Sequence, residues 1–382
     1  MRPFLILLSL GVFLSILSHA QTTTQKGAVA PAPAKLTSPE VHADRTVTFR
    51  LRDPHAKNVA LILDGAPPAA MKKGDDGVWA ITTAPLNPEF YGYSFQADGV
   101  NLLDPNNPEL KPNLISVSNI VYVPGPASLP WELNDVPHGI IHHHFYHSKI
   151  VGDDRDYYVY TPPGYEADLK QSYPVLYLLH GFSDDASAWT SVGRANVILD
   201  NLIAQGKAKP MIVVMPLGYG APEILAEGFG AMDRDHPLRD KNFRKFTDAL
   251  LNEVLPQVEL QYRVIADRNS RAIAGLSMGG TESLLTGLNH LDQFAWIASF
   301  SAGGLPDDFD AYFKDIKASD DSRIRLLWIA CGTDDDLIRD SRHLKLWFTP
   351  EGILYVGIET PGMHNWLVWR DNLANFAPRL FR

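Results

Sequence analysis

The strongest constraint on the fold is an alternation of wholly apolar strand segments with helical segments in the second part of the chain. A strand whose residues are all apolar needs cover on both faces, which a parallel sheet between two layers of helices provides. We therefore predict an open, mostly parallel sheet with helices on both faces for residues 136–382. The expected strands are 174–179, 211–215, 272–276, 296–299, 325–330 and 353–358, and the expected helices include 197–204, 243–258, 281–290 and 344–348.

In the part of the chain that precedes residue 136, the apolar residues recur with a different period. Apolar and polar residues alternate from Val47 to Leu51, and turn-forming pairs such as Asp98-Gly99 separate the short segments that follow. Short strands at this spacing are typical of a small β-sandwich, which we place at residues 40–125 with Trp79 in its core. Its further expected strands are 58–63, 77–83, 91–97 and 114–123.

The first residues predict export. A positive charge at Arg2, a short apolar run over residues 4–16 and a small-residue end at Ala20 have the form of a secretory signal peptide, residues 1–20. The run is shorter than the roughly 20 residues that a membrane span requires, so we expect cleavage and no membrane anchor. Residues 21–39, rich in Thr, Ala and Pro, are the expected linker. The mature chain is thus expected in the periplasm or outside the cell.

The net charge, the single cysteine and the histidines exclude several kinds of partner and site. With 44 acidic and 34 basic residues among 382, the formal net charge is −10, so we expect no nucleic-acid partner. Cys331 is the only cysteine, which excludes an intrachain disulfide, and we expect it to be buried. His142, His143, His144 and His147 lie close in sequence, but no cysteine or carboxylate completes a ligand set, so we interpret them as a polar strand and expect no metal.

Residues 275–279 match the pattern Gly-x-Ser-x-Gly. The motif follows an expected strand and precedes a helical segment that begins at Thr281, which is the setting of a nucleophile elbow. In such an elbow the serine backbone is strained, and the flanking glycines remove Cβ atoms that would collide. Ser277 is therefore the predicted nucleophile. The motif alone leaves open a Gly-rich turn with a capping serine.

A serine nucleophile needs a base and an acid that orients the base, and in this type of sheet the chain order is Ser, acid, His. His364 follows the last expected strand and is the predicted base, because His343 lies in a charged helical segment and is expected to face solvent. The acid lies in the turn after the preceding strand. Asp334, Asp335 and Asp336 are adjacent there, and the pattern does not choose among them.

Two backbone N–H groups are expected to bind the oxyanion of the reaction. One belongs to Met278, after the nucleophile, and the other to Phe182, in the loop after the strand 174–179. The segment 217–240 follows another strand and is expected to cover the substrate. The aromatic residues expected near this edge, as candidates for a flat acyl-binding slot, are Phe182, Trp189, Tyr219 and Trp366.

Residues 271–280, 331–335 and 362–366 together resemble the feruloyl esterase branch of the esterase D-like α/β-hydrolases, carbohydrate esterase family one. The resemblance extends from Arg155 to the C-terminus. It implies an α/β-hydrolase fold, and it implies that the acid is the second residue after a Gly-Thr pair, which is Asp335 here.

The predicted sandwich also resembles a known group. Residues 59–63, 77–79, 91–95 and 104–108 are similar to the immunoglobulin-like early-set modules classed with glycogen-binding domains. The likeness implies a small immunoglobulin-like β-sandwich domain in front of the hydrolase domain. Its motifs specify the fold and not a ligand.

The main functional hypothesis is an exported serine carboxylesterase that removes ester-linked substituents, above all feruloyl groups on xylan, from plant cell-wall polysaccharide. Ser277 attacks the ester, His364 moves the proton and Asp335 orients the imidazole, with no cofactor. Three alternatives stay open: a siderophore (enterochelin-type) esterase, an acetylxylan esterase or acyltransferase of the same fold, and a carbohydrate-binding protein without activity. The acidic net charge disfavours an anionic iron complex as substrate. The oligomeric state is not predicted.

Overall fold

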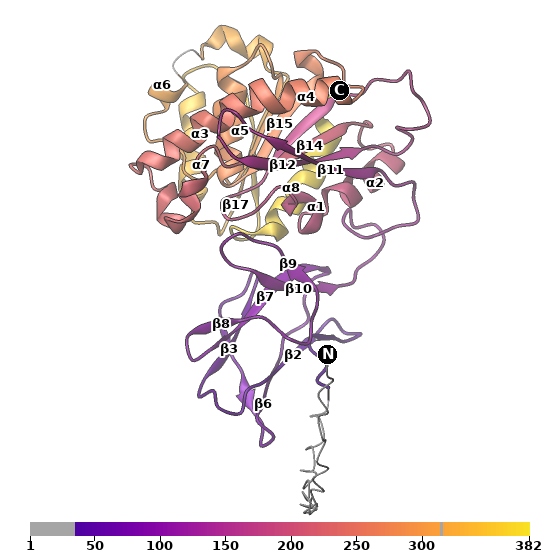
Figure 1. The fold of residues 1–382 in the computed structure, drawn as a ribbon, viewed down its shortest axis with the longest axis vertical. Coiled ribbons are helices and arrows are strands. Elements are labelled where there is room, and N and C mark those ends of the chain that lie inside the picture. Colours follow the sequence, from indigo (N-terminus) through magenta and orange to yellow (C-terminus); the bar gives the residue numbers. More distant parts are fainter. Residues whose placement is uncertain (1–34, 314–315) are drawn as a thin grey trace, which may run out of the picture. The chain divides into compact units, whose positions relative to one another are not determined.

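The second part of the chain forms the expected mostly parallel sheet (Figure 1). The computed structural model describes residues 35–313 and 316–382, so the predicted signal peptide, 1–20, and most of the predicted linker, 21–39, lie outside the described residues. Within that described part, the large sheet has eight strands in the order β11-β12-β14-β13-β15-β16-β17-β18, and from β14 onward all neighbours are parallel. The strands are β11 (Ile140–His147), β12 (Asp154–Thr161), β13 (Val175–Leu179), β14 (Ile212–Pro216), β15 (Arg271–Leu276), β16 (Trp296–Phe300), β17 (Leu326–Gly332) and β18 (Val356–Thr360).

Two hydrophobic cores cover the two faces of this sheet. Every residue of β13 is buried; Tyr177 and Leu179 join one core, while Leu176 and Leu178 join the other. Figure 1 shows α3, α4 and α5 on one side of the sheet and α1, α2 and α8 on the opposite side. The apolar strand pattern therefore predicted the layers correctly. The helices are α1 (Ala188–Ser191), α2 (Ala195–Ala204), α3 (Pro237–Ala249), α4 (Leu255–Gln261), α5 (Met278–Asn289), α6 (Phe309–Tyr312), α7 (Ile338–Phe348) and α8 (Trp366–Phe376).

The helix expected at 243–258 is longer and interrupted. It runs through α3, a π-helical turn η3 (Leu250–Val254) and α4. Pro256 lies in the first turn of α4 and has no backbone N–H, so the regular hydrogen-bond ladder cannot continue through it. The proline accounts for the break.

Residues 40–123, here named the N-terminal β domain, form two smaller sheets that share a core. Phe49 and Tyr93 come from different sheets, and their ring centroids lie 4.7 Å apart. Trp79 is buried, as predicted, and its indole N–H donates to the carbonyl of Asp53. The immunoglobulin-like assignment stays a prediction. One sheet consists of β1 (Glu40–Val41), β2 (Val47–Arg52), β6 (Val78–Thr82) and β5 (Lys72–Lys73), and the other of β4 (Ala69–Ala70), β3 (Val59–Leu63), β7 (Glu89–Ala97), β10 (Ser118–Val123), β9 (Leu110–Lys111) and β8 (Val100–Leu102).

The strand expected at 114–123 begins only at Ser118. Asn113 Oδ1 accepts the N–H groups of Ile115 and Ser116, at 3.0 and 2.8 Å, which bends the chain into a turn. The N–H of Leu114 donates to the Ser183 carbonyl of the large domain at 2.7 Å, and not to a strand. The start of the expected strand was wrong for this reason.

From Leu36 to Arg382 the chain forms one compact unit. Arg370 of α8 is fully buried where the N-terminal β domain meets the large sheet's helices. Its Nε lies 2.9 Å from Glu89 Oε1, and its Nη atoms donate to the carbonyls of Phe90 and Val192. Among the described residues, no helix is long and apolar enough to cross a membrane.

Candidate active site

Ser277 occupies a sharp turn between β15 and α5. Its φ of 51° and ψ of −119° lie in a region that residues with a side chain seldom adopt. A Cβ at Gly275 would lie 2.2 Å from the carbonyl oxygen of Gly279, and one at Gly279 would lie 2.4 Å from that of His180. The two glycines of the motif are therefore required sterically. The Ser277 side chain remains partly exposed, as a nucleophile must be.

The structure brings Ser277, His364 and Asp335 together. His364 Nε2 lies 3.0 Å from Ser277 Oγ, and His364 Nδ1 lies 2.8 Å from Asp335 Oδ2. The three residues follow β15, β18 and β17, whose carboxyl ends meet at one edge of the sheet. His343, the histidine set aside in the sequence, is exposed on α7. The geometry is that of an activated serine whose base is oriented by a carboxylate.

Asp335 differs from its two neighbours in its burial. Asp335 is 2% exposed, whereas Asp334 and Asp336 are exposed to solvent. Burial by itself raises the pKa of Asp335, but the hydrogen bond and charge of His364 and the N–H of Leu337 outweigh it and hold the pKa below its usual value. The carboxyl group therefore stays ionised beside the imidazole.

The loops that carry the acid and the base are joined by backbone hydrogen bonds. The Thr333 N–H donates to the Thr360 carbonyl at 2.8 Å, and the Asp334 N–H donates to the Gly362 carbonyl at 2.9 Å. A Cβ at Gly332 would lie 2.4 Å from the Gly362 carbonyl oxygen, so the two loops are close enough to require glycine there. This joint fixes Asp335 relative to His364.

The two predicted oxyanion donors lie beside the nucleophile. A Cβ at Gly181 would come within 3.2 Å of Ser277 Cβ, which places the start of the Phe182 loop against the elbow. Within residues 35–313 and 316–382, neither the Phe182 nor the Met278 N–H has a hydrogen-bond acceptor. Both groups are thus available to a ligand oxygen.

His180 fixes the start of the oxyanion loop, which we define as residues 180–184. The Gly218 N–H donates to His180 Nε2 at 2.8 Å, so the ring proton lies on Nδ1, which donates to the Gly181 carbonyl at 2.8 Å. Burial lowers the pKa of His180 and keeps the ring neutral. The imidazole is a structural bridge and not a second base.

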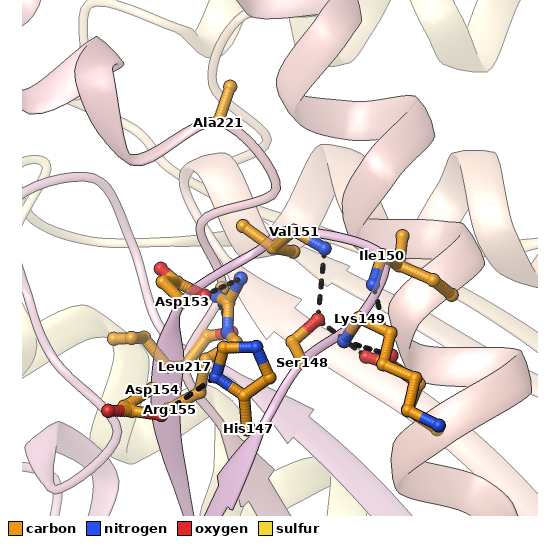
Figure 2. Close-up of polar contacts among 12 residues, drawn as sticks. His147, Ser148, Lys149, Ile150, Val151, Asp153, Asp154, Arg155, Leu217 and Ala221 are labelled. Atoms are coloured by element: carbon orange, nitrogen blue, oxygen red, sulfur yellow. Dashed lines mark hydrogen bonds and ion pairs between the residues drawn. The ribbon is translucent and has the colours of Figure 1, made fainter.

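The segment after β14 supports the other end of this loop. The Tyr219 hydroxyl donates to the Asp184 carbonyl at 2.9 Å. Arg155 of β12 binds the same segment, since its Nη2 donates to the Leu217 carbonyl at 2.9 Å (Figure 2). The oxyanion loop is therefore supported by β12 and by the β14 loop.

Three aromatic residues expected to contact substrate are part of the core. Trp189, Tyr219 and Trp366 are 0%, 1% and 1% exposed. Trp189 donates its indole N–H to the Leu179 carbonyl and packs edge-on against Trp366 at 5.1 Å. A side chain without exposed surface cannot contact a substrate, so this part of the slot hypothesis was wrong. Trp189 and Trp366 lie in the helices α1 and α8, which follow β13 and β18, and their side chains point into the core.

An exposed aromatic residue that the sequence analysis did not single out lies beside the oxyanion loop. Phe229 lies in a short helical turn, η2 (Gly228–Met232), inside the segment 217–240, and is 65% exposed. Its ring lies 5.3 Å from that of Phe182, edge-on. Met232 of the same turn lies against Gly304, next to Gly303, where a Cβ would come within 2.9 Å of Ser277 Oγ. The signal was an isolated phenylalanine in a loop expected at the catalytic edge.

The histidine cluster is spread along the edge strand β11. His143 bonds Asp156 at 2.7 Å, and His147 bonds Asp154 at 2.8 Å. Among the residues that the structure describes, no three His, Cys, Asp or Glu side chains are grouped so as to hold a metal ion. Each of these histidines has a separate partner.

Comparison with known proteins places this site in a family. A family described as "Putative esterase" matches residues 148–380, which include Ser277, Asp335 and His364. An endo-1,4-beta-xylanase/feruloyl esterase from Xylanibacter ruminicola is 31% identical over 355 residues, 90% of this chain and 46% of that protein. The chain thus spans about half the length of this curated relative.

Solved structures give the same fold. A ferulic acid esterase with 27% identity and a TM-score of 0.53 covers 63% of this chain and 97% of its own. The enterobactin esterase from Shigella flexneri, at 19% identity and a TM-score of 0.65, covers 87% of this chain and 92% of its own, which shows a shared fold alone. The esterase resemblance and the α/β-hydrolase-like fold are therefore confirmed, and the chain belongs to this esterase family.

Proposed function

We propose that the protein is a serine carboxylesterase. The observation that supports this most directly is the continuous contact from Asp335 through His364 to Ser277, at 2.8 and 3.0 Å, on a strained elbow. Each contact is within the range required for proton transfer and for fixing an imidazole tautomer.

In the proposed mechanism, Ser277 Oγ attacks the ester carbonyl while His364 Nε2 takes its proton. The N–H groups of Phe182 and Met278 stabilise the oxyanion, each donor contributing about 3 kcal/mol in the transition state. His364 then protonates the leaving alcohol, and a water molecule activated by the same imidazole hydrolyses the acyl-enzyme. Asp335 stays ionised throughout and stabilises the imidazolium that forms twice in the cycle.

We propose feruloyl esters on xylan as the substrate class. The relative from Xylanibacter ruminicola carries both xylanase and feruloyl esterase in its name, and a solved ferulic acid esterase is 27% identical. In this chain, the exposed ring of Phe229 beside Phe182 offers an apolar surface next to the oxyanion loop, which suits an aromatic acyl group. Because xylan lies outside the cell, the proposal includes export by the predicted signal peptide, residues 1–20.

The test compares kcat/KM for methyl ferulate with that for a simple acetyl ester. Ser277→Ala is expected to lower kcat on both esters by about 10⁵-fold or more. Phe229→Ala should lower kcat/KM for methyl ferulate about two- to tenfold, the range for loss of one aromatic contact, and leave the acetyl ester unchanged. The matched control is Phe145→Ala, since Phe145 is also exposed but lies on the edge strand β11.

Equal preference for the acetyl ester would exclude the feruloyl assignment and keep the esterase. Loss of both activities in Phe229→Ala, with Phe145→Ala unchanged, would show that Phe229 supports the loop and does not bind the acyl group. Full activity of Ser277→Ala on either ester would refute the proposed mechanism.

A siderophore ester is the second candidate. The fold of the enterobactin esterase covers 87% of this chain, which is more than residues 136–382 alone contain. The net charge of −10 argues against binding of an anionic iron complex. Hydrolysis of a catecholate triester faster than methyl ferulate would favour this candidate.

A further inference from the structure

The oxyanion loop is also held from the side of the N-terminal β domain. Asn113 Nδ2 donates to Ser183 Oγ at 2.9 Å and to Asp184 Oδ1 at 3.2 Å. The next backbone N–H, that of Leu114, donates to the Ser183 carbonyl at 2.7 Å. Three hydrogen bonds from two adjacent residues therefore connect the domain to the two residues that follow the oxyanion donor Phe182.

The residues that accept these hydrogen bonds have little conformational freedom and little access to water. Ser183 is 6% exposed and has a φ of 71°, a left-handed conformation that is uncommon for a residue with a side chain. Asp184 is 5% exposed. A buried carboxylate and a strained backbone persist only where neighbouring groups compensate them, and Asn113 with Leu114 supplies that compensation.

Asn113 is itself fixed by its own loop. Its Oδ1 accepts the N–H groups of Ile115 and Ser116, so its amide nitrogen has one orientation, toward the oxyanion loop. The two functions of this side chain are therefore separable. The oxygen holds the turn of the N-terminal β domain, and the nitrogen holds the catalytic loop.

We propose that Asn113 is a positioning residue for the reaction, and that the N-terminal β domain is through it a component of the active site. The side chain holds Ser183 and Asp184 so that the adjacent Phe182 N–H points at the oxyanion. This proposal rests on the esterase function proposed above. It requires that breaking the contact lowers kcat more than it lowers substrate binding or stability.

The most selective variant is Asn113→Asp. It keeps the oxygen that accepts from Ile115 and Ser116, and replaces the amide donor by a second carboxylate oxygen opposite Asp184. The Ser183 hydroxyl can adapt because a hydroxyl donates as well as accepts. The contact with Asp184 is lost only once both carboxyl groups are ionised. Burial raises the pKa of Asp184 to about 7 in the wild type, and a second carboxylate at position 113 raises it further, so the measurement belongs at about pH 9 or above.

The partner variant is Asp184→Asn, which still accepts from Asn113. Combining the two substitutions reverses the contact, because the amide at 184 then donates to the carboxylate at 113. We expect Asn113→Asp to lower kcat on the best ester about tenfold or more, less than the loss of an entire oxyanion donor, with KM within about threefold. The double variant should recover kcat to within about threefold of wild type.

Asn101→Asp is the matched control, since Asn101 is exposed on β8 of the same domain. It should leave kcat and the thermal midpoint unchanged. The rate at which a fluorophosphonate labels Ser277 gives a second readout that needs no ester substrate, and it should fall in Asn113→Asp and recover in the double variant.

The proposal is overturned if Asn113→Asp keeps wild-type kcat and labelling rate, or if the double variant fails to recover either one. It is also overturned if the variant loses activity only through unfolding, seen as a lower thermal midpoint with normal kcat per folded molecule. Failure of the esterase proposal is distinct: no ester would be hydrolysed by wild type, while the labelling comparison would still report on Asn113.

Discussion

Replacing Glu89 by Gln is expected to destabilise the whole chain strongly, because it leaves a buried guanidinium without its counter-charge. The side chain of Arg370 is 0% exposed and that of Glu89 is 6% exposed, and their charged atoms lie 2.9 Å apart. Burial raises the pKa of Glu89 in spite of Arg370, and burial lowers the pKa of Arg370 in spite of Glu89. Desolvation therefore dominates this pair, and neither charge is tolerated there alone.

The expected loss of stability follows from the cost of leaving one buried charge without its partner. Removing one partner of a buried ion pair costs about 3–5 kcal/mol, because the other charge stays buried and unpaired. The remaining partners of Arg370, the carbonyls of Phe90 and Val192, are neutral and compensate only in part. In a chain of this size such a loss lowers the thermal midpoint by roughly 4–7 °C.

The assay is thermal and chemical unfolding of the full chain with Glu89→Gln, Arg370→Met and both. The double variant should lose less stability than the two single losses together, by about 1–3 kcal/mol, since it removes both charges at once. The control is Glu359→Gln, whose carboxylate pairs with Arg342 and Lys345 at the surface and should contribute less than about 1 kcal/mol. A midpoint for Glu89→Gln equal to that of Glu359→Gln, or strictly additive losses, would refute the reasoning.

Two further predictions concern single carboxyl groups. Asp335→Asn should lower kcat about 10³–10⁴-fold with little change in KM, because an amide stabilises the wrong tautomer of His364, while Asp334→Asn and Asp336→Asn should stay near wild type in ester-hydrolysis kinetics. Asp184→Asn should become more stable relative to wild type as the pH rises from 4 to 7. Burial raises the pKa of Asp184 to about 7 in the folded state against about 3.9 unfolded, so wild type alone loses up to about 4 kcal/mol across that window. Denaturant unfolding at pH 5 and pH 8 measures this, and an equal difference at both values would contradict it.

The large sheet and the elbow could be predicted because their signals are local. Fully apolar strands require two covered faces, and glycine at position 275 is required by a contact of 2.2 Å with Gly279 within the turn itself. The order of Ser277, Asp335 and His364 follows from the order of the strands. Cys331 is buried, as its place in an apolar strand predicted.

The choice of Asp335 needed more than the local pattern. Three consecutive aspartates have identical side chains and differ only in which one points into the protein. That direction depends on how closely the loop around Gly362 approaches the loop that carries the aspartates. The resemblance to a family selected Asp335, and burial agrees with that selection. For the aromatic residues, the sequence pattern did not lead to the correct choice.

A position after a strand did not reveal that the side chains of Trp189 and Trp366 point into the core while that of Phe229 is exposed.

The contribution of the N-terminal β domain could not be predicted from either pattern or resemblance. Its strands predicted a separate small domain, yet it meets the catalytic domain at two buried polar sites, Arg370 in the helix that follows His364 and Asp184 in the oxyanion loop. Each site joins a charged group of one domain to a polar partner in the other, so each depends on the two domains staying in register.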